Sequence, residues 1–180
     1  GHSQFERIPI SDERQEAMLR KQIDDLEMAI QSARYEQDGG RYTVKQIEKT
    51  RKTLQTRLEK LNQKEKKDQV VTFEELGVDH LYVDEAHSYK NAFLYTKMRN
   101  VAGIAQNEAQ KSAYMFNKCQ YLDEITGGKG ITFATGTPIS TSMTEFFVMQ
   151  RYLQNSKLQN MGLGLFDSWA STFGEVVTSI

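Results

Sequence analysis

Cysteine, proline and long apolar runs are scarce in this sequence, and its charges nearly cancel. Cys119 is the only cysteine among 180 residues, which excludes an intramolecular disulfide and favours a reducing, cytoplasmic environment. No apolar run is long enough to span a bilayer. The net charge is -1, so the chain is not uniformly basic, and any contact with nucleic acid needs a local patch. With Pro9 and Pro138 as the only prolines, long stretches are free to be helical.

Residues 11–67 carry a helical apolar period in two parts. Ser11, followed by two acids, is typical of a helix start, and residues 37–40 are typical of a turn. Thr43, with Gln46 three residues later, predicts a capping box at the start of a second helix. The apolar positions, at steps of three, four or seven residues, are Leu19, Ile23, Leu26, Ile30 and Ala33, then Val44, Ile47, Leu54, Leu58 and Leu61. We therefore expect an antiparallel, coiled-coil-like helical hairpin.

The two helical segments carry opposite charges. Residues 11–38 have a net charge of -4 and residues 44–67 one of +6, which favours their pairing. The bases in the second segment are Lys45, Lys49, Arg51, Lys52, Arg57, Lys60, Lys64, Lys66 and Lys67. They are interpreted either as a solvated face paired with the acidic helix or as a nucleic-acid contact.

Short strands and helices alternate after residue 68. Residues 72–76 predict a short helix ended by Gly77, residues 80–83 predict a buried parallel strand, and residues 131–134 predict a second short strand. Helices are expected at 108–126, from about Ser142 to Leu153, and around Phe166, Trp169 and Phe173. This order predicts an α/β fold with a parallel sheet.

Two adjacent acids, Asp84 and Glu85, follow the first predicted strand. Hydrolysis of ATP needs one carboxylate to hold magnesium and another group to orient the attacking water, and neighbouring acids at a strand end can divide these tasks. Residues 84–87 read D-E-A-H and resemble motif II of superfamily 2 helicases. The continuation through Lys90 and Asn91 resembles the form found in Swi/Snf-type DNA translocases.

A second motif follows the second predicted strand. Thr135, Gly136, Thr137 and Pro138 resemble motif III of the same helicases, although Thr141 stands where that family usually has asparagine. A further likeness is to the helicase-like proteins of phages and conjugative elements that are often joined to an adenine-DNA methylase. Residues 3–9 and 121–128 resemble stretches of those proteins, which implies a bacterial or phage-encoded parent.

The resemblance implies a role for each matching residue. Asp84 would bind magnesium through water, Glu85 would be the catalytic base or the group that positions the water, and His87 would couple the nucleotide site to motif III. Thr135 and Thr137 would relay the nucleotide state, while Lys90 and Asn91 would lie behind the site. The implied cofactors are ATP and Mg2+, and the implied partners are double-stranded DNA, the other motor domains of the parent and a methylase module. Lys60, Lys64 and Lys67 are the candidate DNA contacts.

The phosphate-binding sequence G-x-x-x-x-G-K-[ST] does not occur in the 180 residues. Residues 127–130 do not replace it, because their spacing differs and a strand follows them. We therefore expect a partial RecA-like domain, inactive alone, with a lead-in segment at 1–10, a hairpin insertion at 11–67 and the C-terminal half of the ATPase domain at 68–180. Its incomplete sheet would favour self-association without physiological meaning. The alternative is a non-catalytic interaction module with vestigial ATPase motifs.

Overall fold

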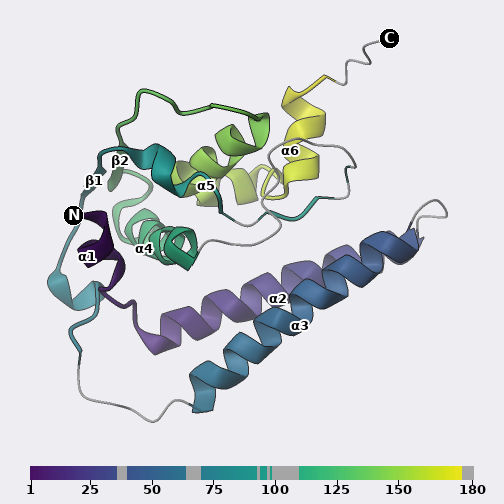
Figure 1. Cartoon of the computed structure of the whole chain (residues 1–180), viewed down its shortest axis with the longest axis horizontal. Helices are drawn as coiled ribbons and strands as arrows, with labels where there is room; N and C mark the ends of the chain where they lie inside the picture. The colour runs from purple at the N-terminus through teal and green to yellow at the C-terminus, as the bar shows by residue number, and fades with distance from the viewer. Residues whose placement is uncertain (36–39, 64–69, 93, 97, 99–109, 176–180) are drawn as a thin grey trace. The chain divides into compact units, whose positions relative to one another are not determined.

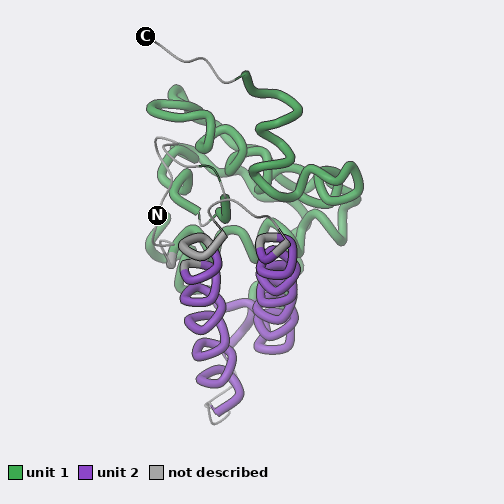
Figure 2. The backbone as a smooth tube through the Cα atoms, turned by 90° about the vertical axis from the view of Figure 1, so that its right-hand side faces the viewer, with its two compact units in different colours: residues 1–8, 73–180 green, residues 9–72 purple. Residues whose placement is uncertain are grey.

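The computed structural model describes all residues except 36–39, 64–69, 93, 97, 99–109 and 176–180. The chain forms two compact units, one of Gly1–Ile8 with Phe73–Ile180 and the other of Pro9–Thr72 (Figure 2). The described residues form six α-helices and a two-stranded parallel sheet. None of the described helices combines the length and the apolar character needed to cross a bilayer.

The smaller unit is a pair of long helices, α2 (Asp12–Tyr35) and α3 (Gly40–Gln63) (Figure 1). Arg34 pairs with Glu48 at 3.4 Å and Arg51 pairs with Glu27 at 3.1 Å, so α2 and α3 run antiparallel. The predicted helical pair is confirmed. The predicted cap at Thr43 is wrong, because α3 already begins at Gly40. The apolar seam starts only at Val44, so the period could not reveal this first turn.

Apolar burial, more than charge, stabilises the hairpin. The buried side chains of its seam are Ile23, Leu26, Ile30, Ile47 and Leu54. Burying each such side chain contributes about 1.5–3 kcal/mol. The side chains in the Arg34–Glu48 and Arg51–Glu27 pairs are 36–66% exposed, and exposed pairs contribute less than about 1 kcal/mol each.

The larger unit contains the sheet, in which β1 (Leu81–Val83) and β2 (Ile131–Phe133) run parallel. Leu81 is in register with Ile131 and Val83 with Phe133. The other elements are α1 (His2–Glu6), the 3-10 turns η1 (Glu74–Leu76) and η2 (Ala86–Tyr89), α4 (Gln110–Thr126), α5 (Met143–Asn160) and α6 (Phe166–Phe173). The expectation of an α/β fold holds only in part, because the described residues are mostly helical and the sheet has two short strands.

Helix α5 is longer than its sequence predicts. It continues past Leu153 to Asn160, with a non-helical backbone at Gln154 (φ -155°, ψ 44°). Beyond this kink, Ser156 donates a hydrogen bond to Asp123 of α4, and Leu158 is buried. Packing against α4 therefore continues the helix after the break in its backbone. The start predicted for α4 at residue 108 lies outside the described residues.

The core of the larger unit lies between α4 and α5. Cys119, Leu122 and Phe147 are buried there. The Tyr152 hydroxyl lies 3.0 Å from the carbonyl oxygen of Tyr89 and 3.1 Å from that of Ser112. Burial raises the pKa of the Cys119 thiol. This core holds the chain that follows β1 against α4 and α5.

Helix α1 packs on this core, although no sequence pattern predicts it. Lys118 Nζ donates a 3.0 Å hydrogen bond to the carbonyl oxygen of Phe5 and lies 4.6 Å from the centre of the Phe5 ring. Tyr89 donates a 3.2 Å hydrogen bond to Glu6. Burial lowers the pKa of Lys118 to about 8, and burial with the nearby Glu6 carboxylate raises the pKa of Tyr89 to about 12.

Candidate functional site

A tight turn directly after β1 presents the two acids of motif II. Glu85 has φ 53° and ψ 42°, and it is the one non-glycine residue with positive φ in the described chain. Its backbone N–H donates to Asp84 Oδ1 at 2.9 Å, and the N–H of Ala86 donates to the carbonyl oxygen of Ala134 at 3.1 Å. A left-handed backbone costs a residue with a side chain about 1–2 kcal/mol. The turn leaves both carboxylates exposed at the carboxyl end of the strand.

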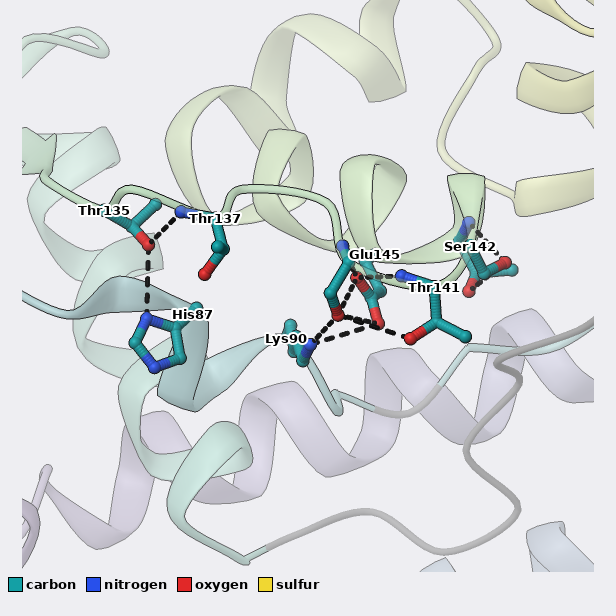
Figure 3. Close-up of polar contacts among 9 residues, drawn as sticks. His87, Lys90, Thr135, Thr137, Thr141, Ser142 and Glu145 are labelled. Carbon is teal, nitrogen blue, oxygen red and sulfur yellow. Dashed lines mark hydrogen bonds and ion pairs between the residues drawn. The ribbon is translucent and has the colours of Figure 1, made fainter.

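His87 connects this turn to the chain that follows β2. Its Nδ1 atom lies 3.2 Å from Thr135 Oγ1 (Figure 3). The same atom lies 3.1 Å from Glu85 Oε2. The N–H of Thr137 also donates to Thr135 Oγ1, at 3.2 Å. An ionised Glu85 favours the form of His87 that carries its proton on Nδ1, because two lone pairs would otherwise face each other. The single Nδ1–H is then shared between Glu85 Oε2 and Thr135 Oγ1, and the Thr135 O–H can donate to a further acceptor.

Lys90 makes a second connection between the two motifs. Its Nζ atom donates to Ser140 Oγ and lies 3.3 Å from Glu145 Oε1 (Figure 3). Glu145, near the start of α5, also accepts from the N–H groups of Ser140 at 2.6 Å and Thr141 at 3.3 Å. Burial by itself would raise the pKa of Glu145. These backbone donors, with the side chains of Lys90 and Ser140, outweigh that effect and lower it.

Glu145 was not singled out by sequence reasoning. A signal was present, because Ser142 and Glu145 have the spacing of a capping box. Ser142 does cap α5, accepting from the N–H of Thr144 at 3.2 Å. The capping pattern therefore predicts a helix start here, but it does not predict the contact with Lys90.

The remaining predicted residues are placed as follows. Gly136, Thr137 and Pro138 are exposed between the two connections, and Asn91 is exposed beyond η2. Lys60 is exposed on α3, in the other compact unit. Lys64 and Lys67 lie outside the described residues. The roles assigned to all these residues stay predictions.

Residues 127–130 form a turn into β2. Gly127 and Gly128 have positive φ, and a Cβ added to Gly130 would lie 2.8 Å from the carbonyl oxygen of Asp79. This conformation serves the connection from α4 to β2 and opens no helix on which a phosphate could rest.

Metal ligands do not cluster among the described residues, where no group of three or more His, Cys, Asp or Glu side chains could hold an ion. Magnesium does not require such a group, because it keeps several waters and is bound through one or two carboxylates and substrate phosphates. The exposed Asp84 carboxylate fits such a site.

Comparison with known proteins gives the family. Over 121 residues the chain is 28% identical to Defense against restriction protein B of Escherichia phage P1, a match covering 62% of this chain and 5% of that protein. The chain therefore spans only a small part of that relative's length. No solved structure matches significantly. Residues 1–179 match the family described as "Probable helicase domain". The chain thus belongs to this helicase-domain family.

Proposed function

We propose that this chain is the back half of the first, RecA-like motor domain of an ATP-dependent DNA helicase or translocase. The observation that carries the proposal is the hydrogen bond between His87 and Thr135, which joins the ends of two neighbouring parallel strands. Ligands of parallel sheets bind at the carboxyl ends of the strands, where Asp84 and Glu85 lie. Family membership supports ATP and magnesium as cofactors.

Each side chain of the turn has a task in this proposal. Asp84 would hold magnesium, and Glu85 would orient and deprotonate the water that attacks the terminal phosphate of ATP. His87, bonded to both Glu85 and Thr135, makes the motif III loop sensitive to the state of the catalytic turn. Bound Mg-ATP supplies the chemistry of phosphoryl transfer, and the protein supplies position and charge.

Other parts of the parent protein would complete the motor. The 180 residues contain no phosphate-binding loop, so we infer that another segment binds the β and γ phosphates, and that a second motor domain supplies an arginine finger. The two-stranded sheet supports this inference, because Tyr82 on β1 is 75% exposed. Further strands of the parent would cover such a sheet. We expect this chain alone to bind ATP weakly and not to hydrolyse it.

DNA is the proposed substrate, and α3 has a suitable surface for it. Lys45, Lys49, Lys52 and Lys60 are exposed and recur at steps of four, three and eight residues, opposite the buried seam of α3. Among the described residues, the ion pairs across the hairpin use arginines, and none of these four lysines takes part in one. The lysine stripe, as we call these four residues, therefore favours contact with a phosphate backbone over pairing with α2.

The phage relative supports the same substrate class. Its name states a defence against restriction, and restriction acts on DNA. A methylase module on the same parent would fit this role, and its presence is part of the proposal.

The test is ATP hydrolysis by the full-length parent, with and without double-stranded DNA, beside a Glu85→Gln variant. We expect DNA-stimulated hydrolysis in the wild type and a fall of about a hundredfold to ten-thousandfold in the variant, since Glu85 acts as the general base in the chemical step. If neither protein hydrolyses ATP although nucleotide and DNA bind, the motor proposal is wrong. The motifs would then be remnants in a non-catalytic interaction module.

A further inference from the structure

We propose that Lys90 and Glu145 form a positioning pair that fixes the far end of the motif III loop, residues 135–142, to the segment that follows the catalytic turn. The pair would make the loop move with that turn, and so would couple ATP hydrolysis to DNA. This inference rests on the proposed function and deepens it. Nothing in the comparisons assigns a role to either residue.

The first observation is that the buried Glu145 carboxylate accepts several hydrogen bonds at once. The Glu145 residue is only 5% exposed, and its oxygens accept from two backbone N–H groups, from the Ser140 hydroxyl and from Lys90. The Lys90 side chain is 22% exposed. A buried carboxylate with this many donors is held in one position, because moving it would leave several polar groups without partners.

A capping role alone does not explain this arrangement. In a capping box the acid three residues after the cap accepts from the N–H of the cap residue, here Ser142. Glu145 instead accepts from the N–H groups of Ser140 and Thr141, which precede the cap. It also binds a lysine 55 residues earlier in the chain, which a helix start does not require.

The second observation is that the same short segment holds both ends of the loop. His87 binds Thr135 at the beginning of the loop, and Lys90 binds Ser140 and Glu145 at its end (Figure 3). Between these points, residues 136–139 are exposed.

The body of α5 is bound to the same segment, because Tyr152 Oη lies 3.0 Å from the Tyr89 carbonyl oxygen. A displacement of the catalytic turn would therefore move both ends of the loop together with the first part of α5. Such paired connections give a nucleotide-dependent shift a physical route into the loop.

The experiment uses the full-length parent, four variants of the pair and one control variant. Lys90→Met and Glu145→Gln each break the pair, their combination breaks it from both sides, and Lys90→Arg keeps the charge. Lys157→Met is the matched control, since Lys157 is an exposed lysine near the end of α5. The first measurement is the kinetics of ATP hydrolysis with saturating DNA. The second is the amide hydrogen exchange of residues 136–142.

We expect each single break to lower the DNA-stimulated kcat by about tenfold or more without raising KM for ATP, because the loop is misplaced while the nucleotide site is kept. The double variant should be no worse than either single variant, as for residues that act as one unit. Lys90→Arg should restore most of the rate. Exchange in residues 136–142 should be faster in the broken variants and unchanged in Lys157→Met.

The outcomes separate this inference from the proposed function. Unchanged exchange of residues 136–142 in both single variants would overturn the positioning pair, whether or not the parent hydrolyses ATP. Faster exchange in a parent that lacks hydrolysis would support the pair as a structural tie while the motor proposal fails. The coupling role is wrong if kcat falls only in variants that also lose thermal stability, and if Lys90→Arg does not restore kcat.

Discussion

His87 Nδ1 lies 3.2 Å from Thr135 Oγ1, although 48 positions separate the two residues in the chain. The parallel pairing of β1 with β2 brings them together, because each residue follows the carboxyl end of one of these strands. The bond therefore depends on the register of the sheet as well as on the two side chains.

Replacing Thr135 by valine tests this bond at nearly constant volume. In the parent we expect Thr135→Val to lower DNA-stimulated hydrolysis by about tenfold, since motif III loses its contact with His87, and to leave ATP affinity nearly unchanged. Hydrolysis rates and direct nucleotide titration would measure this. Thr132→Val is the matched control, because Thr132 Oγ1 makes a similar 3.1 Å contact with His80 outside the motifs. Equal effects of the two substitutions would contradict the prediction.

The left-handed backbone of Glu85 predicts a conflict between stability and activity. Asparagine adopts positive φ more readily than glutamate, so Glu85→Asn should stabilise the chain by roughly 0.5–1 kcal/mol while removing hydrolysis in the parent. Denaturant unfolding followed by the fluorescence of Trp169 would report the change. Glu85→Gln is the control, because it also loses the carboxylate but gains no preference for this backbone. Equal stability of the two variants would show that the left-handed backbone of Glu85 does not destabilise the chain.

The lysine stripe on α3 predicts salt-dependent DNA binding. Reversing Lys49, Lys52 and Lys60 to glutamate should weaken the affinity of the parent for duplex DNA and flatten its dependence on salt, because fewer counterions are released. Fluorescence anisotropy at several salt concentrations would measure both quantities. Lys21→Glu, on the exposed surface of α2, is the control. An unaltered salt slope in the triple variant would remove α3 from the DNA interface.

Because the pKa of Lys118 is lowered, we expect the stability of the folded chain to change with pH in the alkaline range. Its pKa is lowered from 10.5 to about 8 in the folded chain, so between these values the unfolded chain binds more protons and stability rises with pH. Between pH 8 and 9 the free energy of unfolding should rise by up to about 1 kcal/mol. Above about pH 9 the raised pKa of Cys119, and above 10 that of Tyr89, act in the opposite direction and lower stability.

The measurement is denaturant unfolding of this chain at pH 7 to 10, followed by Trp169. Lys118→Met should lose the gain between pH 8 and 9 and keep the decline above it, because the other two groups remain. A rise of the same size in Lys118→Met would show that another group titrates there.

Apolar period and turn residues predicted most of the helices and the positions of both strands, because those features are local. The expectation that the first strand is buried is wrong for Tyr82, which is 75% exposed. Helix α1 escaped prediction because its five residues carry no period and it packs against Lys118, far along the chain. The motif sequences identified Asp84, Glu85 and His87, but Glu145 required the structure. A glutamate three residues after a serine cap has an ordinary local explanation, and its contact with Lys90 arises only in the packed chain.

The non-helical backbone at Gln154 divides α5 into two parts that do not have to move together. The part before the break carries Glu145 and is tied to the motif III loop, whereas the part after it is anchored on α4 through Ser156 and Asp123. A straight helix would transmit a tilt along its whole length, but a helix with a joint can take up the tilt at one residue. Tyr152, just before the break, is also bonded to the Ser112 carbonyl oxygen of α4, so the turns of α5 that can tilt with the loop are those nearer to Glu145, while the far end of the helix stays still.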